Sequence, residues 1–285
     1  MDYGIVQFTS DRGLTPQVLA PLIEKAGFAS YFVPEHGHIP TRREAAHPRT
    51  GDASLPDDRY MRTLDPWTSL AAAAAVTERI GLATAVALPV QSDPITLAKT
   101  LATLDHISGG RVTLGVGFGW NLDELSDHNV PAKRRRTMLR EYLEAMRTLW
   151  TDEEAEYHGE FVDFGPSWAW PKPAAHIPTL VGAAGNERNF RWIARTADGW
   201  ITTPGEEDIE GSVSLLHQIW SDVGRDGAPQ VVVLDFKPVP EKLARWREIG
   251  VTTVLYGLPD ESVERASAYL DKLAGKLDLT AAPAG

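Results

Sequence analysis

Residues 93–117 read DPITLAKTLATLDHISGGRVTLGVG and contain one complete unit of helix followed by strand. Asp93 followed by Pro94 is typical of a helix start, because aspartate can cap the first turn and proline suits the first helical position. The glycine pair at 109–110 is typical of a helix end. The run at 111–117 is short and mostly apolar, as in strands buried on both faces. The stretch therefore predicts a helix that leads into a strand of a parallel sheet.

The same unit recurs along the chain. Short apolar segments, which we expect to be strands, lie at residues 3–8, 30–34, 80–88, 111–117, 178–182, 199–203, 230–235 and 252–257. Segments with helical spacing or helix-start signals follow them, at residues 16–26, 65–79, 93–108, 131–150, 186–196 and 208–223, from 238 onward, and at 260–272. Strand and helix thus alternate, which is the pattern of a parallel sheet covered by helices.

This alternation predicts an α/β fold, a (β/α)8 barrel formed by a single domain at residues 1–285. An open, doubly wound sheet is the competing arrangement. One segment, at about residues 152–176, breaks the alternation, and the sequence YHGEFVDF at 157–164 within it is typical of a small hairpin. We therefore expect a small insertion after the fourth helix of the barrel.

The composition excludes several classes of protein. The formal net charge is −11, from 28 Lys and Arg against 39 Asp and Glu, whereas nucleic-acid-binding proteins usually carry a basic balance or stripe. The chain has no cysteine, which excludes disulfides, iron–sulfur clusters and thiol nucleophiles. No stretch approaches the about 18 consecutive apolar residues of a membrane helix, and the N-terminus lacks signal-peptide features. We expect a cytoplasmic protein with no nucleic-acid or membrane partner.

The strand ends are where a barrel places its active site. Glu35 and His36 follow the second expected strand and open the segment 35–64, which has no apolar periodicity. An imidazole beside a carboxylate can move protons near neutral pH. We interpret Glu35 and His36 as candidate catalytic residues. The alternative is a loop histidine beside a solvated glutamate.

Two segments rich in small residues also end strands. The loop GAAGN at 182–186 precedes a helix, where backbone N–H groups can approach a phosphate; a tight strand–helix turn is the alternative. The segment GVGFGWN at 115–121 lacks the third glycine of a dinucleotide fingerprint at the required spacing. Its glycines instead suit a strand end that a planar ligand can approach. Phe118 and Trp120 are then either stacking residues or core aromatics.

His36 and His38 form a His-x-His pair, which some metal-dependent hydrolases carry on this barrel. In those enzymes the pair normally ends the first strand, and further ligands end later strands. Here it ends the second expected strand, and the histidines from His106 onward lie away from strand ends. The chain also has no HExxH and no GxSxG motif. We therefore assign no metal ligand, and keep a metal-dependent hydrolase only as an alternative.

Six further segments can be read together. They are LATLDHISGGRVTLGVGFGW (101–120), VPEH (33–36), IGLATAV (80–86), DP (93–94), VGAAG (181–185) and ADGW (197–200). Together they resemble the bacterial luciferase-like monooxygenases, in particular the branch that depends on the deazaflavin coenzyme F420. The resemblance extends to about residue 203, and the family's (β/α)8 barrel agrees with the alternation described above.

The resemblance implies individual site residues. Glu35 and His36 match the family's acid–histidine pair, whose histidine lies near the reactive face of the flavin. Ala85 and Val86 match a third-strand bulge that carries a non-proline cis peptide against the ring in the deazaflavin branch. The remaining matched positions border the cofactor or form its phosphate loop; they are Gly117, Asn121, Gly182, Ala183, Ala184, Gly185 and Asn186.

One departure from the family pattern concerns the segment after the fourth strand. Some members carry a glutamate proton donor there, whereas this chain has Phe118, Gly119 and Trp120. Glu124 lies too far along the chain to be assigned that role. A sugar-phosphate dehydrogenase mechanism is therefore not expected.

The resemblance also implies a function. We expect an oxidoreductase that transfers hydride between coenzyme F420 and a small organic substrate, with His36 as proton donor or acceptor. An FMN-dependent monooxygenase is the alternative, and a flavin-binding protein without catalysis is an alternative of another class. Because relatives by resemblance are often homodimers, we expect a homodimer.

Overall fold

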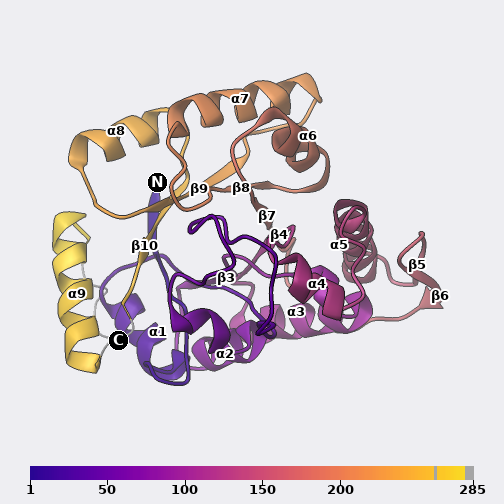
Figure 1. Ribbon diagram of the computed structural model, residues 1–285, viewed down its shortest axis with the longest axis horizontal. Helices are drawn as coiled ribbons and strands as arrows, with labels where there is room; N and C mark the ends of the chain where they lie inside the picture. The colour runs from indigo at the N-terminus through magenta and orange to yellow at the C-terminus, as the bar shows by residue number, and fades with distance from the viewer. Residues whose placement is uncertain (260–261, 280–285) are drawn as a thin grey trace.

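A closed barrel of parallel strands forms the centre of the computed structural model, which describes residues 1–259 and 262–279 (Figure 1). Around the barrel the strand order is β1-β10-β9-β8-β7-β4-β3-β2. The strands are β1 (Asp2–Val6), β2 (Ser30–Val33), β3 (Gly81–Thr84), β4 (Val112–Gly117), β7 (Thr179–Gly182), β8 (Gly199–Ile201), β9 (Gln230–Asp235) and β10 (Thr253–Gly257). The predicted (β/α)8 barrel is confirmed, and the open sheet is not formed.

Helices surround the barrel on its outer side (Figure 1). They are α1 (Pro16–Lys25), α2 (Pro66–Ala74), α3 (Pro94–Ser108), α5 (Arg135–Thr151), α6 (Glu187–Thr196), α7 (Ile209–Asp222), α8 (Pro240–Glu248) and α9 (Val263–Lys276). Asp93 caps α3 as predicted, since its side chain accepts from Thr96 N at 2.7 Å. Among the helices of the described residues, none combines the length and apolar character needed to cross a membrane.

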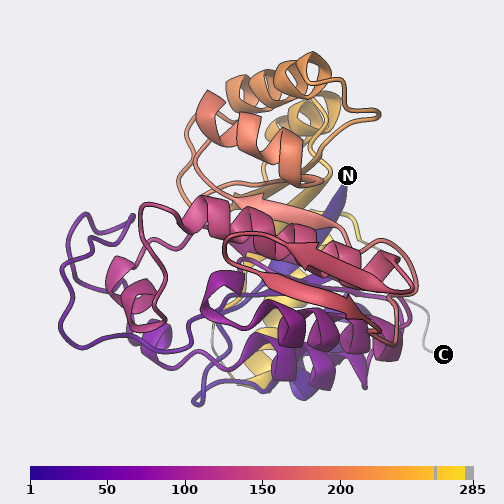
Figure 2. The same ribbon diagram turned by 90° about the vertical axis from the view of Figure 1, so that its right-hand side faces the viewer.

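The predicted hairpin is also present. β5 (Ala155–His158) and β6 (Asp163–Ser167) pair as a two-stranded antiparallel sheet outside the barrel. Figure 2 shows this hairpin beside α5, and Tyr157 Oη donates to Glu144 Oε2 of α5 at 2.6 Å. The segment after the helix therefore packs on the outside of the barrel and leaves its carboxyl end open.

Several predicted boundaries were wrong. The helix predicted from 131 begins at Arg135, and a short helix that was not predicted, α4 (Leu122–Asp127), precedes it. β3 ends at Thr84 instead of 88, although Ala87 still forms a bridge with Val116 of β4, and the 3-10 helix η2 (Pro89–Gln91) follows. α2 ends at Ala74, five residues early. The last helix was predicted over 260–272; residues 260–261 lie outside the described residues, and the helix continues to Lys276.

The hydrophobic core has two layers, one inside the barrel and one between the strands and the helices, and the carboxyl end of the barrel carries polar groups. Inside the barrel the packed side chains are Phe32, Ala83, Leu180, Ile201, Val232 and Leu255. A larger cluster fills the space between strands and helices. Gly115 of β4 permits the close inner packing, because a Cβ there would lie 1.8 Å from Thr84 O.

The connection between β2 and α2 is long and crosses this carboxyl end. It contains the 3-10 helix η1 (Asp58–Met61). Its far end is fixed to β1, because Leu64 N donates to Thr9 O at 3.0 Å and Thr63 forms a bridge with Ser10. Three acidic residues of α4 hold its near end, since Glu124 and Asp127 contact His36 and His38, and Asp123 accepts from Glu44 N and Ala45 N.

Candidate functional site

His36, just after β2, meets a carboxylate from a distant part of the chain. Its Nδ1 lies 3.1 Å from Glu124 Oε2 of α4. The two side chains are only 7% and 1% exposed. A carboxylate bound to one ring nitrogen fixes the orientation of an imidazole and leaves the other nitrogen for proton exchange. The structure thus makes Glu124 the carboxylate partner of His36, a role that the sequence analysis did not assign to it.

Aromatic rings enclose this pair. The His36 ring centroid lies 5.5 Å from that of Tyr60 and 6.0 Å from that of Trp120. His47 completes the enclosure, at 5.0 Å from the Tyr60 ring and 4.6 Å from the Trp120 ring. We call these four residues, His36, Tyr60, Trp120 and His47, together with Glu124, the His36 site. Burial lowers the pKa of His47, and the neighbouring His36 and Arg49 lower it further.

Glu35 binds the backbone of the chain that follows β3. Its Oε2 accepts from Leu88 N at 2.6 Å, which ties the end of β2 to the chain that follows β3. Burial raises the pKa of Glu35 to about 7, and the charges of Asp65 and Glu124 add to the rise. The two predicted catalytic residues therefore share no hydrogen bond, and the carboxylate partner of His36 is Glu124.

The raised pKa of Glu35 predicts a dependence of stability on pH. Because the pKa is about 7 in the folded chain against an ordinary 4.5, only the folded chain keeps the proton between these values. Stability contributed by this group is therefore lost as the pH rises from about 4.5 through about 7. Relative to wild type, Glu35→Gln should gain on the order of 2 kcal/mol between pH 4.5 and pH 8. Denaturant unfolding across this range measures the effect, and parallel curves for the two proteins would contradict it.

The peptide between Ala85 and Val86 is cis, as the resemblance implied. Val86 lies between two of the predicted cofactor-bordering glycines. A Cβ on Gly117 would lie 2.6 Å from Val86 Cγ2, and one on Gly182 would lie 2.6 Å from Val86 Cγ1. These glycines therefore make room for the Val86 side chain, where the sequence suggested an opening for a planar ligand.

Phe118 and Trp120 point in different directions. Trp120 belongs to the His36 site, whereas the Phe118 ring lies 5.0 Å from the Trp192 ring of α6. The guanidinium carbon of Arg136 lies 4.0 Å from the Phe118 ring centroid. Phe118 is thus a packing residue between α5 and α6, and only Trp120 is placed near His36.

The predicted phosphate loop, residues 182–186, is bound by the carboxylate of Glu206, which follows β8. Gly185 N donates to Glu206 Oε2 at 3.0 Å. Asn186 caps α6, since its Oδ1 accepts from Asn189 N at 3.0 Å. Asn189 in turn donates to Ala184 O at 2.8 Å. One backbone donor of the loop is therefore already occupied by an internal anion.

Three arginines beside this loop form what we call the arginine cluster: Arg135, Arg136 and Arg188. Arg136 Nη2 donates to Asn189 Oδ1 at 2.8 Å. Burial lowers the pKa of Arg136, and the like charges of Arg188 and Arg135 lower it further. Over residues 1–259 and 262–279, no carboxylate forms an ion pair with any of the three. Such a cluster is suited to an anion such as a phosphate.

Two buried polar atoms at the start of α4, Asn121 Nδ2 and Glu124 Oε1, have no hydrogen-bond partner among the described residues. Asn121 is 2% exposed, and its Oδ1 caps α4. Buried polar atoms usually have a hydrogen-bond partner in proteins, so these two atoms are available to a polar ligand that reaches the His36 site. In the described part of the chain, no three His, Asp or Glu side chains are grouped so as to hold a metal ion.

Sequence reasoning missed Glu124, Tyr60 and His47. For Glu124 a signal existed, because Asn121 followed by two acidic residues is typical of a helix start and would have predicted α4. Tyr60 and His47 lie in a connection without periodicity, so no pattern pointed to Tyr60, and His47 was considered only as a neighbour of the His-x-His pair.

Known proteins similar to this chain were found by sequence and by structure. The family model described as luciferase-like monooxygenase matches residues 17–273. The uncharacterized protein Rv0953c of Mycobacterium tuberculosis (strain H37Rv) is 70% identical over 278 residues, which are 97% of this chain and 99% of that protein. The F420-dependent glucose-6-phosphate dehydrogenase of Nakamurella multipartita is 34% identical over 212 residues, 73% of this chain and 58% of that enzyme. The crystal structure of monooxygenase RslO1 from Streptomyces bottropensis has a TM-score of 0.75 at 23% identity, covering 97% and 98% of the two chains, and shows a shared fold.

Proposed function

This chain belongs to the luciferase-like monooxygenase family, and from that premise we propose that it transfers hydride between coenzyme F420 and a small organic substrate. The observation that carries the proposal is the buried His36–Glu124 pair at the carboxyl end of β2. A relative 34% identical to this chain is named as F420-dependent, which favours this cofactor over FMN.

The residues of the site fit a deazaflavin. The arginine cluster and the loop at 182–186 would hold the phosphate of the cofactor, because Arg136 and Arg188 have no carboxylate partner among the described residues. Asn121 Nδ2 supplies a buried donor that awaits an acceptor. Val86, set between two glycines, would provide an apolar contact for the ring.

The chemistry is divided between cofactor and chain. When bound, F420 supplies the carbon centre that accepts or donates hydride. His36 would take up or release the proton that accompanies this transfer, and Glu124 would hold the imidazole in position. The rings of Tyr60, Trp120 and His47 would exclude water from the reacting groups, which strengthens the electrostatic interactions inside the site.

A second candidate is an FMN-dependent monooxygenase. The arginine cluster favours it equally, because three arginines beside a glycine-containing loop suit the terminal phosphate of FMN as well as that of F420. A flavin-binding protein without catalysis would use the same contacts, and turnover alone separates it from the two enzymes.

The cofactor proposal predicts the outcome of a titration. F420, FMN and the F420 chromophore without its phosphate-bearing tail are added to the protein, and fluorescence is followed. We expect F420 to bind at least about tenfold more tightly than FMN. Arg136→Gln should weaken F420 about tenfold and leave the tail-less chromophore unchanged, because it removes a charge-assisted contact to phosphate.

Matched measurements make this titration decisive. Arg245→Gln removes an exposed arginine that pairs with Glu210 on α7 and should change nothing. Tighter binding of FMN supports the second candidate. Binding of neither cofactor below about millimolar would overturn both, and binding without turnover on a panel of alcohols and carbonyl compounds would indicate the non-catalytic protein.

A further inference from the structure

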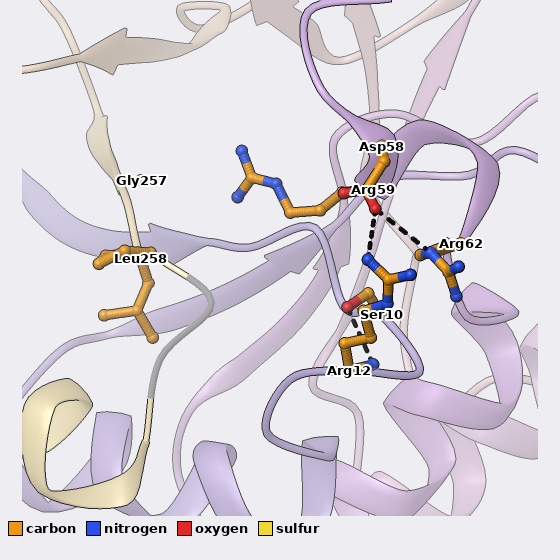
Figure 3. A pocket seen from close by; sticks show the side chains of 8 residues that line it. Ser10, Arg12, Asp58, Arg59, Arg62, Gly257 and Leu258 are labelled. Atoms are coloured by element: carbon orange, nitrogen blue, oxygen red, sulfur yellow. Dashed lines mark hydrogen bonds and ion pairs between the residues drawn. The ribbon is translucent and has the colours of Figure 1, made fainter.

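Charged side chains at the carboxyl end of the barrel mostly neutralise one another. A pocket of about 640 Å³ at the ends of β1 and β10 is lined by three arginines, each of which forms an ion pair with an aspartate (Figure 3). Asp58, for example, lies 2.6 Å from Arg12 and 3.4 Å from Arg62. The positive charge of this pocket is therefore balanced within the chain.

Glu206, on the connection between β8 and α7, is an exception. Its Oε2 accepts from Gly185 N at 3.0 Å, so a carboxylate lies against the loop that we assign to the cofactor phosphate. Over residues 1–259 and 262–279, no lysine, arginine or histidine forms an ion pair with it. The loop therefore carries an unpaired negative charge in addition to the arginine cluster.

Two hydroxyl groups hold the Glu206 carboxylate in place. Thr203 Oγ1 donates to Oε2 at 3.4 Å, and Ser212 Oγ donates to Oε1 at 3.5 Å. The packing is also tight, since a Cβ on Gly185 would lie 2.3 Å from Ser212 Oγ and 3.0 Å from Glu206 Oε1. We therefore expect the carboxylate to remain beside the loop when a phosphate binds there.

The surroundings of Glu206 do not neutralise it. Together with Glu207 and Asp208 it lines a cavity of about 750 Å³ at the carboxyl ends of β8 and β9, and among the described residues neither of these two forms an ion pair. The other acidic residues of the cavity are paired with basic ones, Asp235 with Lys242 and Glu210 with Arg245. Glu206 therefore faces further negative charge on the side away from the loop.

The charge of a phosphate group depends on how it is esterified. A monoester such as the phosphate of FMN carries about −1.5 to −2 at neutral pH, whereas a diester such as the phosphate of F420 carries one negative charge. Coulomb energy is proportional to the charge of the ligand. The arginine cluster thus attracts a monoester more strongly than a diester, and Glu206 opposes a monoester more strongly in the same proportion.

We propose that Glu206 is a specificity-determining residue, which lowers the affinity of the loop for phosphate monoesters and so favours a cofactor with a phosphodiester over FMN. The proposal rests on the proposed function, because it takes the loop as the site of the cofactor phosphate. That phosphate would use the arginine cluster and the N–H groups of Glu187 and Arg188, which begin α6 and have no acceptor within the helix.

The test compares three ligands that share one ring: F420, its chromophore ending in a phosphate monoester, and the chromophore without a phosphate. Fluorescence titration at neutral pH measures their affinities. Glu206→Gln keeps an oxygen that can accept from Gly185 N but removes the charge. It should tighten the binding of F420 about threefold and that of the monoester about tenfold, because doubling the ligand charge squares the factor, and it should leave the chromophore without a phosphate unchanged.

Two further variants sharpen this comparison. Glu206→Ser also removes the charge and should again favour the monoester. Glu210→Gln is the matched control, since Glu210 lines the same cavity but is already neutralised by Arg245 at 3.0 Å; it should change none of the three affinities. Equal gains for F420 and the monoester would overturn the proposal, because Glu206 would then only compete for Gly185 N. Unchanged affinities in the folded Glu206 variants would overturn it as well.

A second pair of probes tests the loop without any cofactor. Phenyl phosphate is a monoester and methyl phenyl phosphate is a diester, and calorimetric titration follows their binding to the full chain. Glu206→Gln should strengthen phenyl phosphate more than methyl phenyl phosphate. If it does so while neither F420 nor FMN binds, the proposed function is overturned and charge selection by Glu206 stands. Equal effects on the two probes would overturn the selection itself.

Discussion

Replacement of His36 by asparagine is expected to lower turnover by at least about 100-fold, with cofactor affinity nearly unchanged. A positioned general acid or base typically contributes about 10²- to 10⁴-fold. Asparagine keeps a polar group of similar reach, but it cannot take up and release a proton as imidazole does near neutral pH. Turnover is measured by the absorbance change of F420 with substrate, and cofactor affinity by fluorescence titration.

His38 offers a matched control two residues away. Its Nε2 lies 2.9 Å from Asp127 Oδ2, so it also pairs with a carboxylate of α4, although through the other ring nitrogen and with a side chain that is 41% exposed. His38→Asn should keep turnover within about twofold of wild type. Turnover of His36→Asn within threefold of wild type would remove His36 from the chemistry, and equal losses in both variants would indicate a role for the loop instead of the imidazole.

The barrel could be predicted from the sequence because the evidence for each strand and helix is local. Capping residues, helical spacing and short apolar runs are each contained within about twenty residues. Eight strand–helix units in succession are compatible with few folds. The errors also have local causes. α4 has only six residues, Leu122–Asp127, so no apolar periodicity develops in it. β3 was extended to 88 because the residues after Thr84 remain apolar, and Ala87 does still form a bridge with Val116 of β4, although the regular strand ends at Thr84.

Only those site residues that directly follow a strand could be predicted from the sequence. That rule selected His36, and the structure places it at the carboxyl end of β2 beside a buried acid. The acid was missed because Glu124 lies 88 residues further along, and only the closure of the barrel brings it near. Tyr60, Arg59 and Arg62 lie in the long connection, where residue type alone cannot distinguish a solvated loop from a pocket wall.

Replacement of Glu124 by glutamine is expected to lower turnover about 10- to 100-fold through His36. Glutamine has nearly the size of glutamate and can still bond Nδ1, but it lacks the negative charge that stabilises an imidazole when it carries a proton. The effect should appear in kcat, with KM and cofactor affinity little changed, because the carboxylate is buried at 1% exposure behind the imidazole. Steady-state kinetics of Glu124→Gln at several pH values measures this split.

A double-mutant cycle shows whether Glu124 acts through His36. If it does, Glu124→Gln should lower turnover less than about twofold in the His36→Asn background, because coupled residues are not additive. Glu141→Gln is the matched control, since Glu141 is also buried and accepts from Phe161 N at 2.7 Å, next to the hairpin; it should affect melting temperature and leave kcat intact. Additive losses in the double variant would mean that Glu124 supports the loop over the barrel, and that His36 works without a carboxylate partner.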